Sequence, residues 1–217
     1  MTATDLPLVF VHGWAFGPEI WAPIPAARPH CASQMLDFGY FSAPPQTELP
    51  QRPFIAIGHS LGALWLLSTM PQYCRGMVLI NGFARFTASD DFPHGIPPRL
   101  LTRMRRRMAA APNDTVRDFR REAGTDLPFP GPPNPQRLDD GLHLLLGLDA
   151  RQGARMAHCP VSCVAGTRDP IAPPALTQDS FAPSTAIEWH DGGHLLPLTH
   201  PDACLQAIDR MMKRMTP

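Results

Sequence analysis

A serine held between two glycines is the feature of this sequence that most directly indicates chemistry. The motif Gly58-His59-Ser60-Leu61-Gly62 follows an apolar run at 54–57 and precedes an apolar helical pattern. A Gly-x-Ser-x-Gly turn between a strand and a helix is a nucleophile elbow, whose strained backbone lifts the serine hydroxyl above the end of the sheet. The glycines leave room for the flanking strand and helix. We therefore predict that Ser60 is a catalytic nucleophile rather than a serine that merely occupies a turn.

A serine hydroxyl needs a base at neutral pH, and the base needs an acid that orients it. In a parallel sheet these groups follow later strands, in the chain order serine, acid, histidine. Asp169 follows the apolar run 161–165, and His194 follows the run 186–189 behind two glycines that free the backbone to turn. We predict a triad of Ser60, His194 and Asp169.

Other residues compete for these roles. Asp169 precedes a proline and also suits a turn, while His190 and His200 lie close to the predicted base in the sequence. Asp191 is a rival acid, but it shares the loop of the histidine and would have to fold back to orient it. His59 neighbours the serine, yet side chains diverge at an elbow. We therefore expect His59 in the core or behind the triad.

The oxyanion that forms on attack needs fixed N–H donors, each worth on the order of 3 kcal/mol. One donor is expected from the backbone of Leu61, the residue after the nucleophile. The second is expected from the loop His12-Gly13-Trp14 after the first strand, and we predict the Trp14 N–H. Trp14 and Phe119 are also expected to wall an apolar acyl pocket. Further candidates for this wall are Leu61, Phe83, Phe86, Leu195 and Leu196.

These residues need a scaffold that brings their loops together. Short apolar runs alternate with helical patterns, and we predict strands at 8–11, 34–36, 54–57, 76–80, 161–165 and 186–189. Helical spacing occurs at 61–70 and 201–215. Alternation of this kind predicts the α/β class, a mostly parallel sheet flanked by helices.

The alternation stops between residues 83 and 158, where strand patterns disappear. Arginines and apolar residues there form opposite stripes of amphipathic helices. The predicted helices are 97–111, 113–124 and 134–148. We predict a hydrolase core formed by 1–82 and 159–217, with 83–158 inserted as a small helical lid over the active end of the sheet.

Charge is balanced over the whole chain, with 19 basic and 19 acidic residues, but it is unevenly distributed. The segment 99–121 carries eight arginines and two aspartates, a net charge of +6, so the rest of the chain carries −6. This segment suits an anionic partner or a solvated helix face. The opposing charge elsewhere and the lack of a recognised motif argue against nucleic-acid binding.

The residue composition bears on metal binding, on the state of the cysteines and on membrane contact. The histidines show no metal-ligand spacing, so we expect no metal and no cofactor. The five cysteines contain no Cys-x-x-Cys pair, which favours reduced thiols in a cytoplasmic protein. The first seven residues do not resemble a signal peptide, and no apolar run is long enough to span a bilayer, so no membrane contact is expected.

The motifs together resemble the α/β-hydrolase superfamily. They are Val11-His12-Gly13-Trp14, Gly58 to Gly62, Gly166-Thr167-Arg168-Asp169 and Gly193-His194. More narrowly, the chain resembles the pimeloyl-[acyl-carrier protein] methyl ester esterases of biotin synthesis. That likeness rests on 10–14 with Glu19-Ile20-Trp21, and on the stretches 86–96 and 141–151. It implies a serine carboxylesterase that cleaves the methyl ester of a carrier-bound dicarboxylic acyl chain.

The resemblance also implies lid arginines that help to hold an acyl carrier protein. Asp114 and Asp118 occupy the positions where we expect such arginines, and Arg117, Arg120 and Arg121 lie beside them. We assign these three arginines to substrate binding. The chain is also short for the family, at 44–49 and around 128–135.

Two other functions stay open. A broad esterase or thioesterase would act on free, small acyl substrates, and the fold by itself does not exclude it. A non-catalytic binding module on a hydrolase shell is the alternative of another class.

Overall fold

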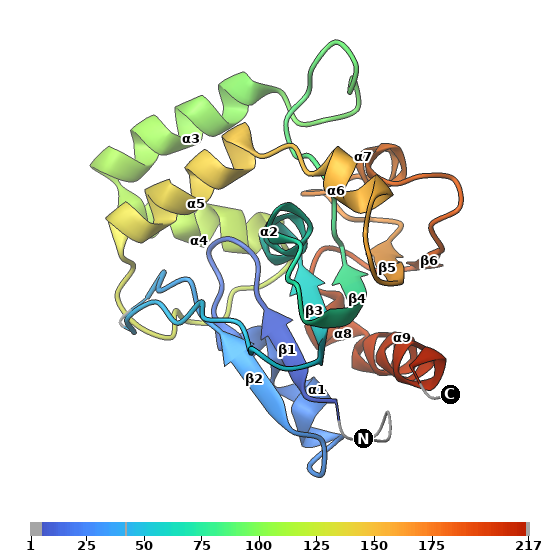
Figure 1. Ribbon diagram of the computed structural model, residues 1–217. Coiled ribbons are helices and arrows are strands. Elements are labelled where there is room, and N and C mark those ends of the chain that lie inside the picture. Colours follow the sequence, from blue (N-terminus) through green and yellow to red (C-terminus); the bar gives the residue numbers. More distant parts are fainter. Residues whose placement is uncertain (1–5, 42, 216–217) are drawn as a thin grey trace.

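The centre of the molecule is a six-stranded parallel sheet (Figure 1). A computed structural model describes residues 6–41 and 43–215. The strand order is β2-β1-β3-β4-β5-β6, and every neighbouring pair is parallel. The strands are β1 (Leu8–Val11), β2 (Ser33–Leu36), β3 (Phe54–His59), β4 (Cys74–Ile80), β5 (Val161–Gly166) and β6 (Ile187–His190). The predicted α/β class is confirmed, and each predicted strand is present.

Helices cover both faces of this sheet. On one face, α2 (Leu61–Thr69) packs against β1 and β3, and α6 (Arg151–Arg155) packs on α2. On the other face, α9 (Pro201–Arg214) lies against β4 and β5. Three short elements join α9 there, namely η2 (Pro18–Trp21), α1 (Pro23–Ala26) and α8 (Leu196–Thr199). Because both faces are covered, β1 and β3 are buried along their whole length.

The edge strands are more exposed than the central ones. Every residue of β1 and β3 is buried, whereas the first two residues of β2 are exposed and none of β6 is fully buried. The helix α7 (Pro174–Ser180) contacts β5 near the second of these edges. The hydrophobic core therefore lies around the central strands. None of the helices in the described part of the chain is long and apolar enough to cross a membrane.

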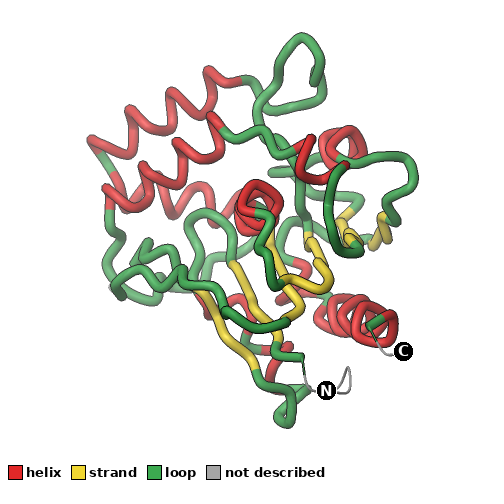
Figure 2. The backbone as a smooth tube through the Cα atoms, viewed as in Figure 1, coloured by secondary structure: helices red, strands yellow, loops and turns green. Residues whose placement is uncertain are grey.

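Three longer helices occupy the segment between β4 and β5. They are α3 (Pro98–Ala110), α4 (Pro112–Glu122) and α5 (Pro135–Gly147), and α3 packs against both of the others. Figure 2 shows them gathered to one side of the sheet, beyond the ends at which the strands finish. Leu101 and Met108 form the buried stripe of α3. The helices match the segment 83–158, and its action as a lid stays a prediction.

Candidate active site

Ser60 lies in the tight turn between β3 and α2. Its φ of 53° and ψ of −119° are strained for a residue that carries a Cβ. The carbonyl of Ser60 accepts the N–H groups of Ala63 at 3.0 Å and Leu64 at 3.2 Å, so the first turn of α2 holds this conformation. A Cβ at position 62 would lie 2.2 Å from the Val11 carbonyl oxygen. Gly62 therefore permits the close approach of helix and strand that keeps the turn strained.

His194 joins the serine to an acid. Its Nε2 lies 3.0 Å from Oγ of Ser60, and its Nδ1 lies 2.7 Å from Oδ2 of Asp169. All three side chains are buried. An imidazole that donates Nδ1–H to the carboxylate presents its Nε2 lone pair to the serine hydroxyl. The structure thus brings the three predicted residues together in the arrangement that a serine nucleophile needs.

Asp169 is held as a carboxylate. Burial raises the pKa of Asp169. The electrostatic interaction with His194 and the hydrogen bonds that Asp169 accepts lower it by more, so the pKa of Asp169 stays below its usual value. Two of these bonds come from the backbone N–H groups of Ile171 and Ala172, at 2.8 and 2.9 Å from Oδ1. The rival acid, Asp191, instead pairs with Arg168, and its side chain is 81% exposed. Of these two aspartates, Asp169 is therefore the one that contacts the histidine.

Asn81 is a further residue of the site, and the sequence analysis missed it. It directly follows β4, is fully buried, and has a φ of 47°. Its Nδ2 donates to Oδ2 of Asp169 at 2.7 Å and to the Gly193 carbonyl at 3.2 Å. One amide thus contacts the acid and the loop that carries the base. One sequence signal could have identified Asn81. It directly follows a strand, β4, which lies in the sheet between the strand that ends before Ser60 and the strand that ends before Asp169.

His59 lies behind the triad. Its Nε2 lies 2.9 Å from the backbone carbonyl of His194, so Nε2 carries the proton and donates it. Burial, followed by the nearby His194, lowers the pKa of His59 to about 3, which keeps the ring neutral. The predicted place of His59 in the core or behind the triad agrees with this contact. This hydrogen bond ties the His59 ring to the main chain of His194.

The loop after β1 runs directly against the nucleophile. A Cβ at Gly13 would lie 2.9 Å from Cβ of Ser60 and 2.8 Å from Nδ1 of His59. The loop continues through Trp14 to Ala15, whose φ is 60°. On the other side, Leu61 is the first residue of α2, where a backbone N–H has no partner within the helix. Leu61 thus directly follows Ser60, and Trp14 directly follows the glycine that packs against Ser60. The role of both N–H groups as oxyanion donors stays a prediction.

A cavity of about 190 Å³ opens onto Ser60. The only charged side chain among the described residues that line it is Glu122. Trp14 and Phe119, both predicted here, meet edge to face with 4.7 Å between ring centroids. The other wall residues include Phe86, Ile96, Leu100 and Met104, whereas the predicted Leu61, Phe83, Leu195 and Leu196 are core residues outside the lining. A wall formed mainly by apolar side chains suits an uncharged acyl chain.

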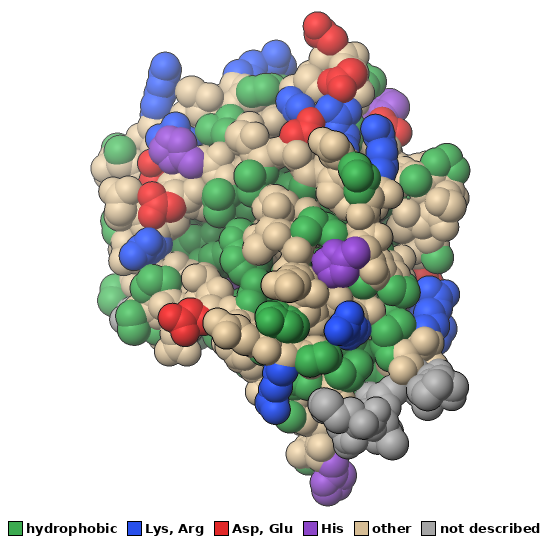
Figure 3. All heavy atoms as spheres, in the orientation of Figure 1, with side chains coloured by type: hydrophobic (Ala, Val, Ile, Leu, Met, Phe, Trp, Pro, Cys, Tyr) green, Lys and Arg blue, Asp and Glu red, His purple; other side chains and the backbone are tan. Residues whose placement is uncertain are grey.

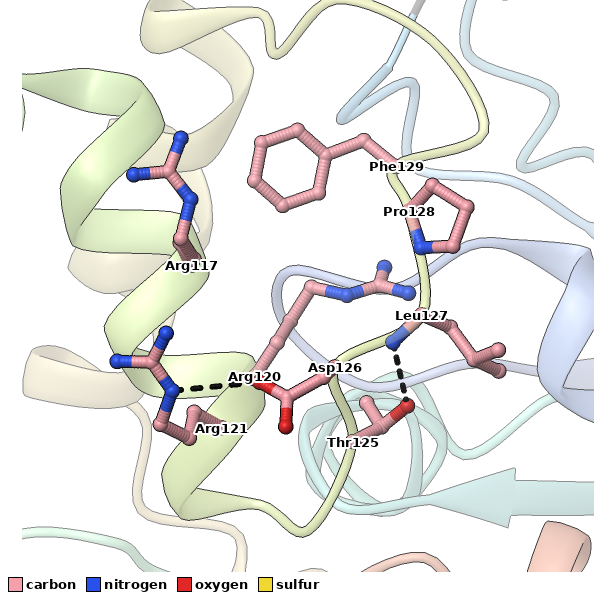
Figure 4. A pocket seen from close by; sticks show the side chains of 8 residues that line it. All are labelled: Arg117, Arg120, Arg121, Thr125, Asp126, Leu127, Pro128 and Phe129. Atoms are coloured by element: carbon pink, nitrogen blue, oxygen red, sulfur yellow. Dashed lines mark hydrogen bonds and ion pairs between the residues drawn. The ribbon is translucent and has the colours of Figure 1, made fainter.

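Arg120 requires a correction. We predicted that it binds substrate or a carrier, but its guanidinium is buried and it is only 2% exposed. It donates to the Ala15 carbonyl at 3.2 Å and to Glu19 at 3.3 Å, and it lies over the Phe16 ring at 4.9 Å. Figure 4 shows its side chain directed between α4 and the segment that ends at Phe129. Arg120 therefore joins α4 to the loop that carries Trp14.

Arg117 and Arg121 differ from Arg120 because both are exposed. Arg117 pairs with Asp114 at 2.6 Å, and Arg121 with Asp126 at 3.2 Å. Together with Arg120 and residues 125–129 they line a surface pocket of about 340 Å³ (Figure 4). That pocket shares no lining residue with the cavity at Ser60. Substrate contact by these two arginines stays a prediction without support from this arrangement.

Comparison with known proteins agrees with the fold and the site. The model of the Alpha/beta hydrolase family matches residues 36–207. The chain belongs to the alpha/beta hydrolase family. It is therefore a hydrolase, and a serine nucleophile is typical of this fold.

This alpha/beta hydrolase is also similar to individual proteins along nearly its whole length. A "Pimeloyl-[acyl-carrier protein] methyl ester esterase" of Legionella pneumophila (strain Corby) is 25% identical over 229 residues, covering 96% of this chain and 95% of the relative. A protein of the same name from Xylella fastidiosa (strain M23) is 28% identical over 241 residues, covering 94% of each. The solved esterase of Exiguobacterium antarcticum is 13% identical and superposes with a TM-score of 0.81, over 98% of this chain and 93% of that one. This last likeness shows the fold.

Proposed function

We propose that this alpha/beta hydrolase is a serine carboxylesterase that hydrolyses the methyl ester of a carrier-bound dicarboxylic acyl chain. The observation that carries the proposal is the contact of Ser60, His194 and Asp169 at an apolar cavity. The relatives' names supply the specific substrate, pimeloyl-[acyl-carrier protein] methyl ester. A reaction of biotin synthesis on such a carrier would take place in the cytoplasm.

The contacts of Ser60, His194 and Asp169 support a two-step reaction. Ser60 Oγ attacks the ester carbonyl while His194 Nε2 takes its proton, and His194 then delivers that proton to the departing methanol. Asp169 keeps the imidazole in the tautomer that does this and stabilises its charged form. The N–H groups of Leu61 and Trp14 hold the oxyanion. A water molecule, activated by the same histidine, then releases the acyl group from Ser60 as a carboxylate.

The cavity favours the ester over the product. Its lining is mostly apolar, so a methyl ester at the end of an acyl chain leaves water without losing the hydration of a charge. The product carries a carboxylate, whose burial in the same place is costly. Glu122 adds repulsion at the cavity. Both effects promote release of the acid.

Mass spectrometry of the carrier after reaction tests the proposal. The enzyme is incubated with an acyl carrier protein loaded with the methyl ester of pimelate, and both carrier and small products are followed. The proposed esterase leaves a free carboxylate on a chain that is still attached to the carrier, and it releases methanol. Release of the whole chain with a free carrier thiol would instead identify a thioesterase. Cleavage of small esters alone would identify the broad esterase.

Growth provides an independent test of the same proposal. A biotin auxotroph that lacks its pimeloyl ester esterase should grow without biotin when it expresses this chain. The same strain should not grow when it expresses Ser60→Ala at an equal level. Growth with the variant would contradict the proposal.

A further inference from the structure

The loop between β4 and α3 forms part of the wall of the cavity at Ser60. We call residues 84–96 the wall loop, because Phe86 and Ile96 both line that cavity. The loop doubles back on itself, since the N–H of Ile96 donates to the Phe86 carbonyl at 2.8 Å and the N–H of Ala88 donates to the Ile96 carbonyl at 3.0 Å. The two cavity-lining residues are therefore held side by side in one backbone unit.

An arginine of α6 ties the outer end of the wall loop to the rest of the molecule. Only 15% of the Arg151 side chain is exposed. Its guanidinium donates to the carboxylate of Asp91 at 2.8 Å and to the Asp91 carbonyl at 3.2 Å, and it lies 5.4 Å from the ring centre of the buried Phe92. It also donates to both carboxylate oxygens of Asp149, at 2.7 and 2.9 Å. One side chain thus bonds the loop and an aspartate outside it.

Asp149 ties the beginning of the wall loop to the same place. Its carboxylate accepts from Arg85 at 2.6 Å, and the N–H of Ala150 donates to the Ala84 carbonyl at 2.7 Å. The hydrogen bonds from Arg151 and then Arg85 keep the pKa of Asp149 well below its usual value, so it is a carboxylate. Acidic and basic side chains gather over this loop at the top of the view (Figure 3).

The helix that carries Arg151 rests on the helix of the nucleophile. Arg151 is the first residue of α6, and α6 packs on α2, which begins directly after Ser60. A Cβ at Gly153 would lie 2.4 Å from the Leu67 carbonyl oxygen, so the two helices approach closely. Contacts therefore run from Ser60 through α2 and α6 to the wall loop, and Arg151 makes the last of them.

We propose that Arg151 is a positioning residue that fixes the cavity wall formed by Phe86 and Ile96 and so determines how well long acyl chains bind. The inference rests on the proposed function, in that Ser60 cleaves an ester whose acyl chain occupies the cavity. A wall held in place costs no ordering when a chain binds, whereas a released wall must be ordered at each binding event. A long chain gains apolar contact with the wall, and an acetyl group has too little apolar surface to gain much.

A comparison of two arginine variants on α6 tests the inference. The test variant is Arg151→Gln, which removes the charge that holds both aspartates. The control is Arg155→Gln, which removes the same charge from an exposed position of the same helix. Steady-state kinetics are measured on p-nitrophenyl octanoate and p-nitrophenyl acetate, and Tm is recorded for each protein.

The ratio of kcat/KM for the octanoate ester to kcat/KM for the acetate ester is the decisive quantity. Arg151→Gln should lower this ratio about tenfold, mainly by raising KM for the octanoate ester. Its kcat/KM for the acetate ester should stay within about threefold of wild type, because Ser60, His194 and Asp169 keep their contacts. Arg155→Gln should leave the ratio within about twofold of wild type.

Two further variants separate positioning from general stability. Arg151→Lys keeps the charge but lacks the planar fork that bonds two carboxylates at once, so its ratio should lie between those of wild type and Arg151→Gln. Asp91→Asn removes only the partner on the wall loop, at a side chain that is 69% exposed and tolerates replacement. It should lower the ratio about threefold, again through KM, and it decides the question if Arg151→Gln does not fold.

Two results would overturn the inference. One is a folded Arg151→Gln or Asp91→Asn variant with an unchanged ratio. The other is an equal loss on the octanoate and acetate esters, because that would place the effect at Ser60 rather than at the wall.

The failure of this inference and that of the proposed function have different signatures. If the wild-type enzyme hydrolyses the carrier-bound methyl ester and Arg151→Gln leaves the ratio unchanged, the role of Arg151 is wrong and the proposed function stands. If the wild-type enzyme cleaves neither the carrier-bound ester nor the two p-nitrophenyl esters, the proposed function is wrong and the role of Arg151 falls with it.

Discussion

The side-chain amide of Asn81 donates a hydrogen bond of 2.7 Å to Oδ2 of Asp169, the oxygen that also accepts from His194. The same amide reaches the carbonyl of Gly193, so it links the acid to the loop of the base. Asn81 is a positioning residue, because it acts on the serine only through these neighbours. Its positive φ suits asparagine, which enters the left-handed region more readily than most residues.

Replacing Asn81 should change the pH profile of the enzyme as well as its rate. Asn81→Gly keeps the backbone conformation but removes the donor to Asp169, and we expect kcat/KM to fall about tenfold. A carboxylate with one donor fewer favours the protonated imidazole more, so the acid limb of the kcat/KM profile should move to higher pH. A lower Tm with an unshifted pH profile would show that Asn81 serves only the fold.

Arg120 should affect turnover more than substrate affinity. It anchors the Ala15 carbonyl beside the predicted oxyanion donor Trp14, so Arg120→Gln should lower kcat for a small ester about tenfold while KM stays within about twofold. Arg117→Gln is the matched control on the same helix and should leave kcat near wild type. The measurement is steady-state kinetics together with Tm. A fall in Tm without a fall in kcat would contradict the role in the oxyanion loop.

His59 should make the protein less stable as pH falls from 6.5 towards 3. In the folded protein its pKa is about 3 against an ordinary 6.5, so only the unfolded chain takes up this proton in that window. The unfolded state then binds more protons, and the free energy of unfolding falls with falling pH. At about 1.4 kcal/mol per pH unit, the loss due to His59 is about 2 kcal/mol between pH 6.5 and 5.

His59→Gln is the variant that isolates this effect, since glutamine retains an amide donor for the His194 carbonyl but does not titrate. Urea unfolding at pH 6.5 and pH 5 should show that wild type loses about 2 kcal/mol more than the variant. Equal losses in the two proteins would mean that His59 is protonated in the folded state.

The sheet was predictable because its strands are continuous apolar runs, as with β1 and β3. The order of the triad was predictable because the loops after parallel strands meet at one edge of the sheet. The elements that the patterns missed are short: η2, α1 and α8 have four residues each, α6 has five and α7 has seven. Two turns or fewer are too short to show the periodic apolar stripe that identifies a helix.

Asn81 and Arg120 show which side-chain contacts the sequence patterns did not predict. Asn81 sits in a sequence typical of a turn, and its contact with Asp169 depends on two strands that are adjacent only in the sheet. Arg120 is one of eight arginines in a segment that suggested a solvated surface. Its spacing of four residues from Val116, which is fully buried, was the available indication that Arg120 faces inward.

The central claim is that Ser60, activated by His194, is the nucleophile of ester hydrolysis, and one measurement tests it most directly. It is kcat/KM of wild type and Ser60→Ala on the carrier-bound methyl ester, with circular dichroism to establish that both proteins are folded. We predict that the variant loses at least about 10³-fold of kcat/KM while its fold is unchanged. A folded Ser60→Ala variant within about tenfold of wild type would contradict the claim, because an enzyme without its nucleophile does not retain such a rate.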